Sequence, residues 1–207
     1  MVRNILFDMG NVLIRFDPHT FIRRYTSSDE DEQILTRKVF LTREWVRMDR
    51  GSLTDEEAAQ IFASRLPDHL KEIGRALTLD WNRDMIPIEG MEELVRELKE
   101  AGYHIFLLSN ASFRQPVYWP DIPGSQYFED ALISAYTGFV KPQPEIFREA
   151  FRKFDIRPEE SVFIDDVPLN VEGAFFSGLD GIVFHGDVQE LREELAARGV
   201  PGGGNKG

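Results

Sequence analysis

Short apolar runs alternate with amphipathic stretches over most of the chain. The runs are rich in Ile, Leu, Val and Phe, as strands buried on both faces of a sheet usually are. They predict strands at residues 4–8, 104–109, 131–134, 161–165 and 181–184. The stretches between and after them predict helices at residues 90–101, 144–154, 170–178 and 187–198. This alternation predicts an α/β fold, in which helices cover both faces of a parallel sheet.

The segments 90–101 and 144–154 show why helices are expected between the strands. In the first, apolar residues recur on one helical face, and Gly102 is suited to end the helix. The second begins with a proline, which favours the first turn of a helix, and also carries an apolar face.

Residues 17–87 interrupt this alternation. They contain several helical patterns but no convincing strand, and a capping box starts one helix at Thr54. Because the interruption directly follows the first strand, we expect a helical cap above the edge of the sheet where ligands bind. The predicted organisation is a core of residues 1–16 and 88–200, a cap of residues 17–87 and a disordered Gly-rich tail of residues 201–207.

Composition narrows the possible partners. The formal charge of -12 opposes binding to nucleic acid or to an anionic membrane, so an anionic substrate would need local cations. The chain has no cysteine, which excludes thiol catalysis and thiolate metal sites. No apolar run approaches the about 18 residues that span a bilayer, so we expect a cytoplasmic protein. Oligomeric state stays open.

Polar residues end or directly follow four of the predicted strands. Taken singly, each has an ordinary explanation as a helix cap, a turn residue or a solvated loop cation. Four such features at the carboxyl ends of parallel strands are expected to meet in one crevice. The residues are Asp8, Ser109, Asn110, Lys141, Asp165 and Asp166.

Their combined chemistry is coherent. Converging carboxylates repel one another and need a hard cation, and a site of oxygen ligands suits Mg²⁺. A lysine beside them neutralises both carboxylates and a phosphate, and Ser109 with nearby backbone N–H groups can bind phosphate oxygens. One carboxylate is then available to attack phosphorus and form an aspartyl-phosphate.

The order of these features resembles the haloacid dehalogenase-like superfamily of hydrolases. The resemblance covers essentially the whole chain, from Asp8 to the helix after Gly178, and includes the helical insert, which looks like the family's cap. It implies a Rossmann-like core, dependence on Mg²⁺ and hydrolysis of a small phosphate ester. The acidic pair Asp165-Asp166 favours phosphoryl chemistry, because the dehalogenating members work without a metal. A phosphoacceptor receiver domain fits poorly, since its acidic pair precedes the phosphorylated aspartate and it lacks such an insert.

The resemblance also implies roles for the metal-binding residues. Asp8 would be the nucleophile and a metal ligand, and Gly10 would offer its backbone carbonyl to the metal. Asp166 would bind Mg²⁺, with Asp165 beside it or behind it. Asn170 would either orient this loop or cap the following helix.

For the phosphoryl group, the resemblance implies three further residues. Ser109 and Asn110 would bind it, and Lys141 would clamp it during catalysis.

Gly10 departs from the family pattern, in which an aspartate serves as general acid and then as general base. A positioned acid or base contributes about 10²–10⁴ in rate. Three explanations stay open. The chain is a weak or inactive binding protein, or another group such as Asp17 or His19 takes the role of the missing aspartate. Alternatively, the substrate has a good leaving group that needs little help from a proton. An anomeric sugar phosphate would be such a substrate.

A narrower resemblance favours activity. The stretches DMGNVL, RFD, YWP and FIDDVPLNVEGA resemble a bacterial subgroup that includes alpha-D-glucose-1-phosphate phosphatases, whose members carry the same glycine. We therefore expect a sugar-phosphate phosphatase, with phosphomutase activity as a further alternative. In the insert, Trp45, Arg47 and Met48 are candidates to face the crevice, as is Trp119, although such residues more often belong to a core.

Overall fold

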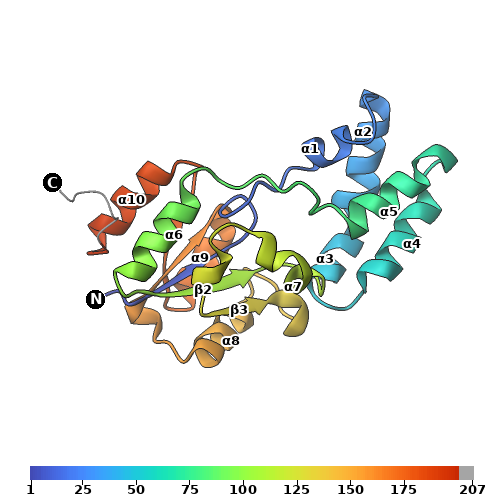
Figure 1. The fold of residues 1–207 in the computed structure, drawn as a ribbon. Coiled ribbons are helices and arrows are strands. Elements are labelled where there is room, and N and C mark those ends of the chain that lie inside the picture. Colours follow the sequence, from blue (N-terminus) through green and yellow to red (C-terminus); the bar gives the residue numbers. More distant parts are fainter. Residues whose placement is uncertain (201–207) are drawn as a thin grey trace.

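Five parallel strands form a sheet in the order β3-β2-β1-β4-β5 in the computed structural model, which describes residues 1–200 (Figure 1). In the centre of the sheet, Phe7 pairs with Leu107 on one side and Ile164 on the other. The strands are β1 (Asn4–Phe7), β2 (His104–Ser109), β3 (Asp130–Ile133), β4 (Ser161–Asp165) and β5 (Asp180–Val183). Each predicted strand is confirmed to within one residue at either end.

Helices cover both faces of the sheet, as the Rossmann-like prediction requires. Side chains alternate along β1, so Ile5 and Phe7 join one apolar cluster and Leu6 joins the other. The first cluster includes α6 (Met91–Glu100) and α10 (Val188–Ala197), and the second includes α8 (Pro144–Phe154) and α9 (Pro168–Phe176). The short helix α7 (Gln115–Tyr118) follows β2. The predicted fold class is confirmed.

The chain between β1 and α6 is helical and lies to one side of the sheet (Figure 1). The capping box at Thr54 is confirmed, because its hydroxyl accepts a bond from the Glu57 N–H and the Glu57 carboxylate accepts one from the Thr54 N–H. The helices are α1 (Pro18–Arg23), α2 (Asp29–Leu35), α3 (Arg43–Asp49), α4 (Asp55–Arg65) and α5 (Lys71–Leu79), with a π-helical turn at Thr36–Phe40. That residues 17–87 form a separate cap domain stays a prediction.

The two segments that connect these helices to the sheet run beside each other. The Arg15 N–H donates to the Ile86 carbonyl at 2.8 Å, and the Ile88 N–H donates to the Leu13 carbonyl at 2.9 Å. The chain therefore leaves and re-enters the core through one paired connection. No helix within residues 1–200 is long and apolar enough to cross a membrane. The predicted disordered tail, residues 201–207, lies outside the described residues.

Candidate active site

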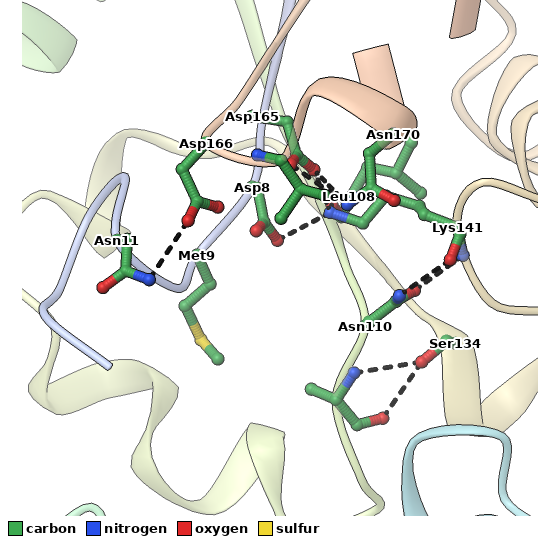
Figure 2. A network of polar contacts seen from close by, with 12 residues as sticks. Asp8, Met9, Asn11, Leu108, Asn110, Ser134, Lys141, Asp165, Asp166 and Asn170 are labelled. Carbon is green, nitrogen blue, oxygen red and sulfur yellow. Dashed lines mark hydrogen bonds and ion pairs between the residues drawn. The ribbon is translucent and has the colours of Figure 1, made fainter. Parts of the chain in front are cut away.

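Asp8 lies at the carboxyl end of the central strand. The apolar residues of β1 are buried, and the Asp8 N–H extends the pairing by donating to the Ile164 carbonyl at 2.8 Å. The chain then turns sharply, with Asn11 in the left-handed region at φ 53°, a conformation that asparagine tolerates better than most residues. This turn leaves the Asp8 carboxylate at the sheet edge, where the loops after the other strands also gather (Figure 2).

Lys141 connects two of the carboxylates. Its Nζ lies 2.8 Å from Asp8 Oδ1 and 2.6 Å from Asp165 Oδ2, and it donates to the Leu108 carbonyl at 3.0 Å (Figure 2). Burial alone would lower the pKa of this ammonium group, but the charges of Asp8 and Asp165 raise it above its usual value. Asn110 fixes the lysine backbone, since its amide oxygen accepts from the Lys141 N–H at 2.8 Å and its amide nitrogen donates to the Lys141 carbonyl at 3.1 Å.

Asp165 is fully buried and surrounded by donors. Besides Lys141, the Asn170 amide donates to its two oxygens at 3.0 and 3.1 Å, and the Val167 N–H donates to Oδ1 at 2.8 Å. Asn170 thus orients the acidic loop. The alternative that Asn170 caps the helix is wrong, because α9 begins at Pro168 with Val167 at the N-cap.

Three carboxylates converge at this edge of the sheet. One oxygen from each of Asp8, Asp165 and Asp166 lies within 4.8 Å of the others, and Asn11 donates to Asp166 Oδ2 at 3.1 Å. Burial raises the pKa of Asp8 to about 6, against the opposing charge of Lys141, and burial also raises the pKa of Asp166. A cluster of carboxylates that ionise with difficulty fits a hard divalent cation, whose charge would stabilise the ionised forms.

A cavity of about 220 Å³ adjoins this cluster. All but one of the site residues predicted from the sequence line it, the exception being the deeply buried Asp165. Those residues are Asp8, Gly10, Ser109, Asn110, Lys141, Asp166 and Asn170. The opposite wall comes from the segment before α1, the helical insert and α7, and it combines aromatic rings with carboxylates. Its residues include Phe16, Trp45, Met48, Asp49, Asp55, Trp81 and Tyr118.

The sequence identified part of this wall and missed its carboxylates. Trp45 and Met48 line the cavity, whereas Arg47 and Trp119 do not. Asp49 follows Trp45 by four positions, so helical spacing from that tryptophan is the signal that points to it. Asp55 stands directly after the capping residue Thr54, a place where an acidic residue is usual for local reasons alone.

The substitutes considered for the missing acid at Gly10 lie elsewhere. The Asp17 carboxylate caps α1 by accepting from the His19 N–H at 3.0 Å and the Thr20 N–H at 3.3 Å. The His19 imidazole lies 2.6 Å from Glu32 Oε1 on the surface. Neither Asp17 nor His19 is among the cavity-lining residues.

Sequence comparison settles the family. The family model described as "haloacid dehalogenase-like hydrolase" matches residues 2–178. The chain belongs to this family. The superfamily resemblance of its strand-end motifs is thereby confirmed.

Named relatives of this chain are distant. It is 25% identical over 161 residues to flavin mononucleotide hydrolase 1 of Arabidopsis thaliana, covering 75% of this chain and 62% of that protein. It is 25% identical over 189 residues to D-ribitol-5-phosphate phosphatase of Bacteroides thetaiotaomicron, covering 83% and 86%. The chain spans 62%, 37% and 64% of the lengths of the first three curated relatives it matches.

A solved structure shares the fold. A haloacid dehalogenase-family enzyme from Bacteroides thetaiotaomicron, in complex with magnesium and inorganic phosphate, superimposes with a TM-score of 0.69 at 22% identity. The match covers 92% of this chain and 99% of that one. For this chain, the carboxylate cluster fits the prediction of Mg²⁺ as cofactor.

Proposed function

We propose that this protein is a Mg²⁺-dependent phosphatase that cleaves a small phosphate monoester through an aspartyl-phosphate on Asp8. One observation carries the proposal: a buried nucleophilic carboxylate, a lysine and a second acidic loop converge on one cavity. The named phosphatases and hydrolases among the relatives support this reaction class. The bacterial sugar-phosphate subgroup is part of the proposal, on the motifs described from the sequence.

Asp8 acts as the nucleophile. Its pKa of about 6 leaves the carboxylate ionised at neutral pH, and the ion pair with Lys141 holds it in one orientation. A carboxylate oxygen forms a bond to phosphorus while the bond from phosphorus to the ester oxygen breaks. Water then attacks phosphorus, the bond to Asp8 breaks, and phosphate leaves.

The metal would be held by the carboxylates of Asp8 and Asp166 with the backbone carbonyl of Gly10. A bound Mg²⁺ supplies positive charge for the carboxylates and for the phosphoryl oxygens. Asp165 accepts bonds from Lys141, Asn170 and a backbone N–H, so its oxygens are already engaged. We therefore assign Asp165 to positioning Lys141 behind the metal ligands.

Ser109 and Lys141 bind the phosphoryl group in this proposal. Ser109 is the last residue of β2 and lines the cavity beside Asp8. Asn110 contributes by fixing the Lys141 backbone through both atoms of its amide. Together these contacts orient one cation and one hydroxyl toward the place where charge develops.

The shape and chemistry of the opposite wall support a sugar phosphate. Trp45, Trp81 and Phe16 offer ring faces for the C–H groups of a sugar, and the carboxylates of Asp49 and Asp55 can accept bonds from its hydroxyls. D-ribitol-5-phosphate, named for one relative, has this combination of a phosphate and a polyol.

A phosphatase screen tests the proposal. Purified protein with Mg²⁺ should release inorganic phosphate from some members of a panel of sugar phosphates and from p-nitrophenyl phosphate. Asp8→Asn should abolish turnover while circular dichroism stays unchanged, and the control Asp130→Asn, an exposed position at the start of β3, should keep it. A wild-type protein without phosphate release, or an active Asp8→Asn variant, would contradict the proposal. Transfer of the phosphate to a second hydroxyl would reveal a mutase.

A further inference from the structure

The last residue of α3, Asp49, brings a carboxylate from the helical insert into the cavity that contains Asp8. Within the described part of the chain, the Asp49 carboxyl group takes part in no hydrogen bond or ion pair with another side chain. A polar group in a cavity without a protein partner is available to a ligand.

The backbone around Asp49 is held against the core. The Ser134 hydroxyl, directly after β3, donates to the Asp49 carbonyl. At Gly51, φ is +72° and a Cβ would lie 2.1 Å from the Ala135 carbonyl oxygen, so only glycine allows this close approach. The turn that carries Asp49 is thus held against the core by both contacts.

The other titratable side chains that line the cavity already have partners or roles. Asp8 and Lys141 form their ion pair, and Asp166 belongs to the proposed metal site. Asp55 Oδ1 accepts a bond from the Ser112 hydroxyl at 2.6 Å. Burial raises the pKa of Tyr118 far above its ordinary value, so its phenol is a poor proton donor.

We propose that Asp49 is the general acid and general base of the reaction, a role that Gly10 cannot fill from the turn after β1. This inference rests on the proposed phosphatase function and names the proton carrier of that same site. In the first step, the Asp49 carboxyl group gives its proton to the ester oxygen as the bond from phosphorus to that oxygen breaks. In the second step, the Asp49 carboxylate takes a proton from the water that attacks phosphorus, while Asp8 is released as a carboxylate. Asp49 ends the cycle protonated, as it began.

The electrostatics of the cavity suit both steps. Burial raises the pKa of Asp49 to about 7, and the negative charges of Asp55 and Asp8 add to this rise. An acid whose pKa lies near neutrality can both give and take a proton at the same pH. Four charged or titratable groups face Asp49 from the elements packed around it: Asp55 on α4, Asp8 after β1, Lys141 before α8 and Tyr118 on α7. The charge of Arg114 opposes the rise that burial causes in the pKa of both Asp55 and Tyr118.

Two substrates separate a proton carrier from a residue that only supports the fold. With a sugar phosphate, Asp49→Asn should lose about 10²–10³ in kcat/KM. With p-nitrophenyl phosphate, the leaving group departs without a proton, so the variant should form the aspartyl-phosphate but hydrolyse it slowly. The expected readout is a burst of nitrophenolate, together with a phosphorylated Asp8 detectable by mass spectrometry.

The pH profile supplies a second readout. The wild type should lose kcat/KM for the sugar phosphate as the pH rises through the pKa of Asp49, and Asp49→Asn should lack this limb. The matched control Asp55→Asn removes a neighbouring negative charge, so it should keep the limb and move it to lower pH.

Gly10→Asp offers a rescue. A Cβ at Gly10 would meet Phe16 Cβ at 3.6 Å, an ordinary contact, so the backbone there accepts a side chain. In the Asp49→Asn background this change should restore at least about tenfold in activity. Three results with an active wild type would overturn this inference alone. The Asp49→Asn variant would lose the same factor in kcat/KM on both substrates, would show no burst, or would keep the limb of the pH profile. A wild type that releases no phosphate overturns the phosphatase proposal as well.

Discussion

Lys141→Met should destabilise the protein strongly at neutral pH. The lysine side chain is 1% exposed, and its Nζ lies 2.8 Å from one carboxylate and 2.6 Å from another. Removing one partner of a buried ion pair typically lowers the free energy of unfolding by about 3–5 kcal/mol, because the remaining charge loses its partner. Here Asp8 and Asp165 would face each other without the shared cation, so we expect a loss in that range.

The loss should depend on pH with a defined sign. Burial raises the folded-state pKa of Asp8 from 3.8 to about 6, so ionisation of Asp8 opposes folding. The stability linked to its proton is present below pH 3.8 and is lost as the pH rises through 6. Because the charge of Lys141 lowers this pKa, the variant should show a still higher pKa and a loss that grows from about pH 5 to about pH 8.

Urea unfolding in buffer with a chelator measures both effects. The control is Lys153→Met, which removes an ion pair to Asp130 on the surface, where the lysine side chain is 40% exposed. Such a pair contributes at most about 1 kcal/mol. The free energy of unfolding is measured at about pH 5 and about pH 8 for each variant. The account of Lys141 as a buried counter-ion is refuted if Lys141→Met lowers this free energy no more than the control does at pH 8. It is also refuted if the loss caused by Lys141→Met is the same at the two pH values.

Three further outcomes are expected. Dialysis against EDTA should abolish phosphatase activity, and adding Mg²⁺ should restore it and raise the midpoint of thermal unfolding, as a ligand of the folded state does. Gly51→Ala should lower both the free energy of unfolding and kcat, because its Cβ would lie 2.1 Å from the Ala135 carbonyl oxygen. The control Gly138→Ala has φ +78° but no atom within 4 Å of a Cβ. It should lower the free energy of unfolding in urea by only about 1–2 kcal/mol. Asn170→Ala should lower the free energy of unfolding by about 1–3 kcal/mol, because Asp165 loses two buried N–H donors, and an unchanged urea midpoint would contradict this.

The core of the fold could be predicted from the sequence because the patterns that specify its strands and helices are local. Each strand is a short apolar run, and α8 was predicted at its observed bounds because a proline starts it and its apolar face ends with Phe154. The strand-end residues could be grouped in advance since parallel strands bring their carboxyl ends to one edge. The start of α9 was predicted two residues late, because Asn170 looked like a cap when Pro168 begins the helix.

The helical wall of the cavity could not be predicted from the sequence in the same way. Whether a tryptophan or an aspartate on α3 faces the sheet depends on how the helical insert packs against the core, which periodicity does not specify. Gly51 illustrates the difference, since its need for glycine arises from Ala135, far away in the sequence. Asp49 therefore emerged only from the three-dimensional arrangement.

The charge distribution of the cavity has a consequence for the end of the reaction. Among the described residues, its lining combines Asp8, Asp49, Asp55 and Asp166 with Lys141 as the counter-charge. Inorganic phosphate formed there is a dianion near neutral pH, and without Mg²⁺ it would face walls in which carboxylates outnumber cations, inside a chain of net charge -12. Repulsion would then oppose its binding. Phosphate should accordingly inhibit turnover only as long as Mg²⁺ is bound, and the metal-free protein should not retain it.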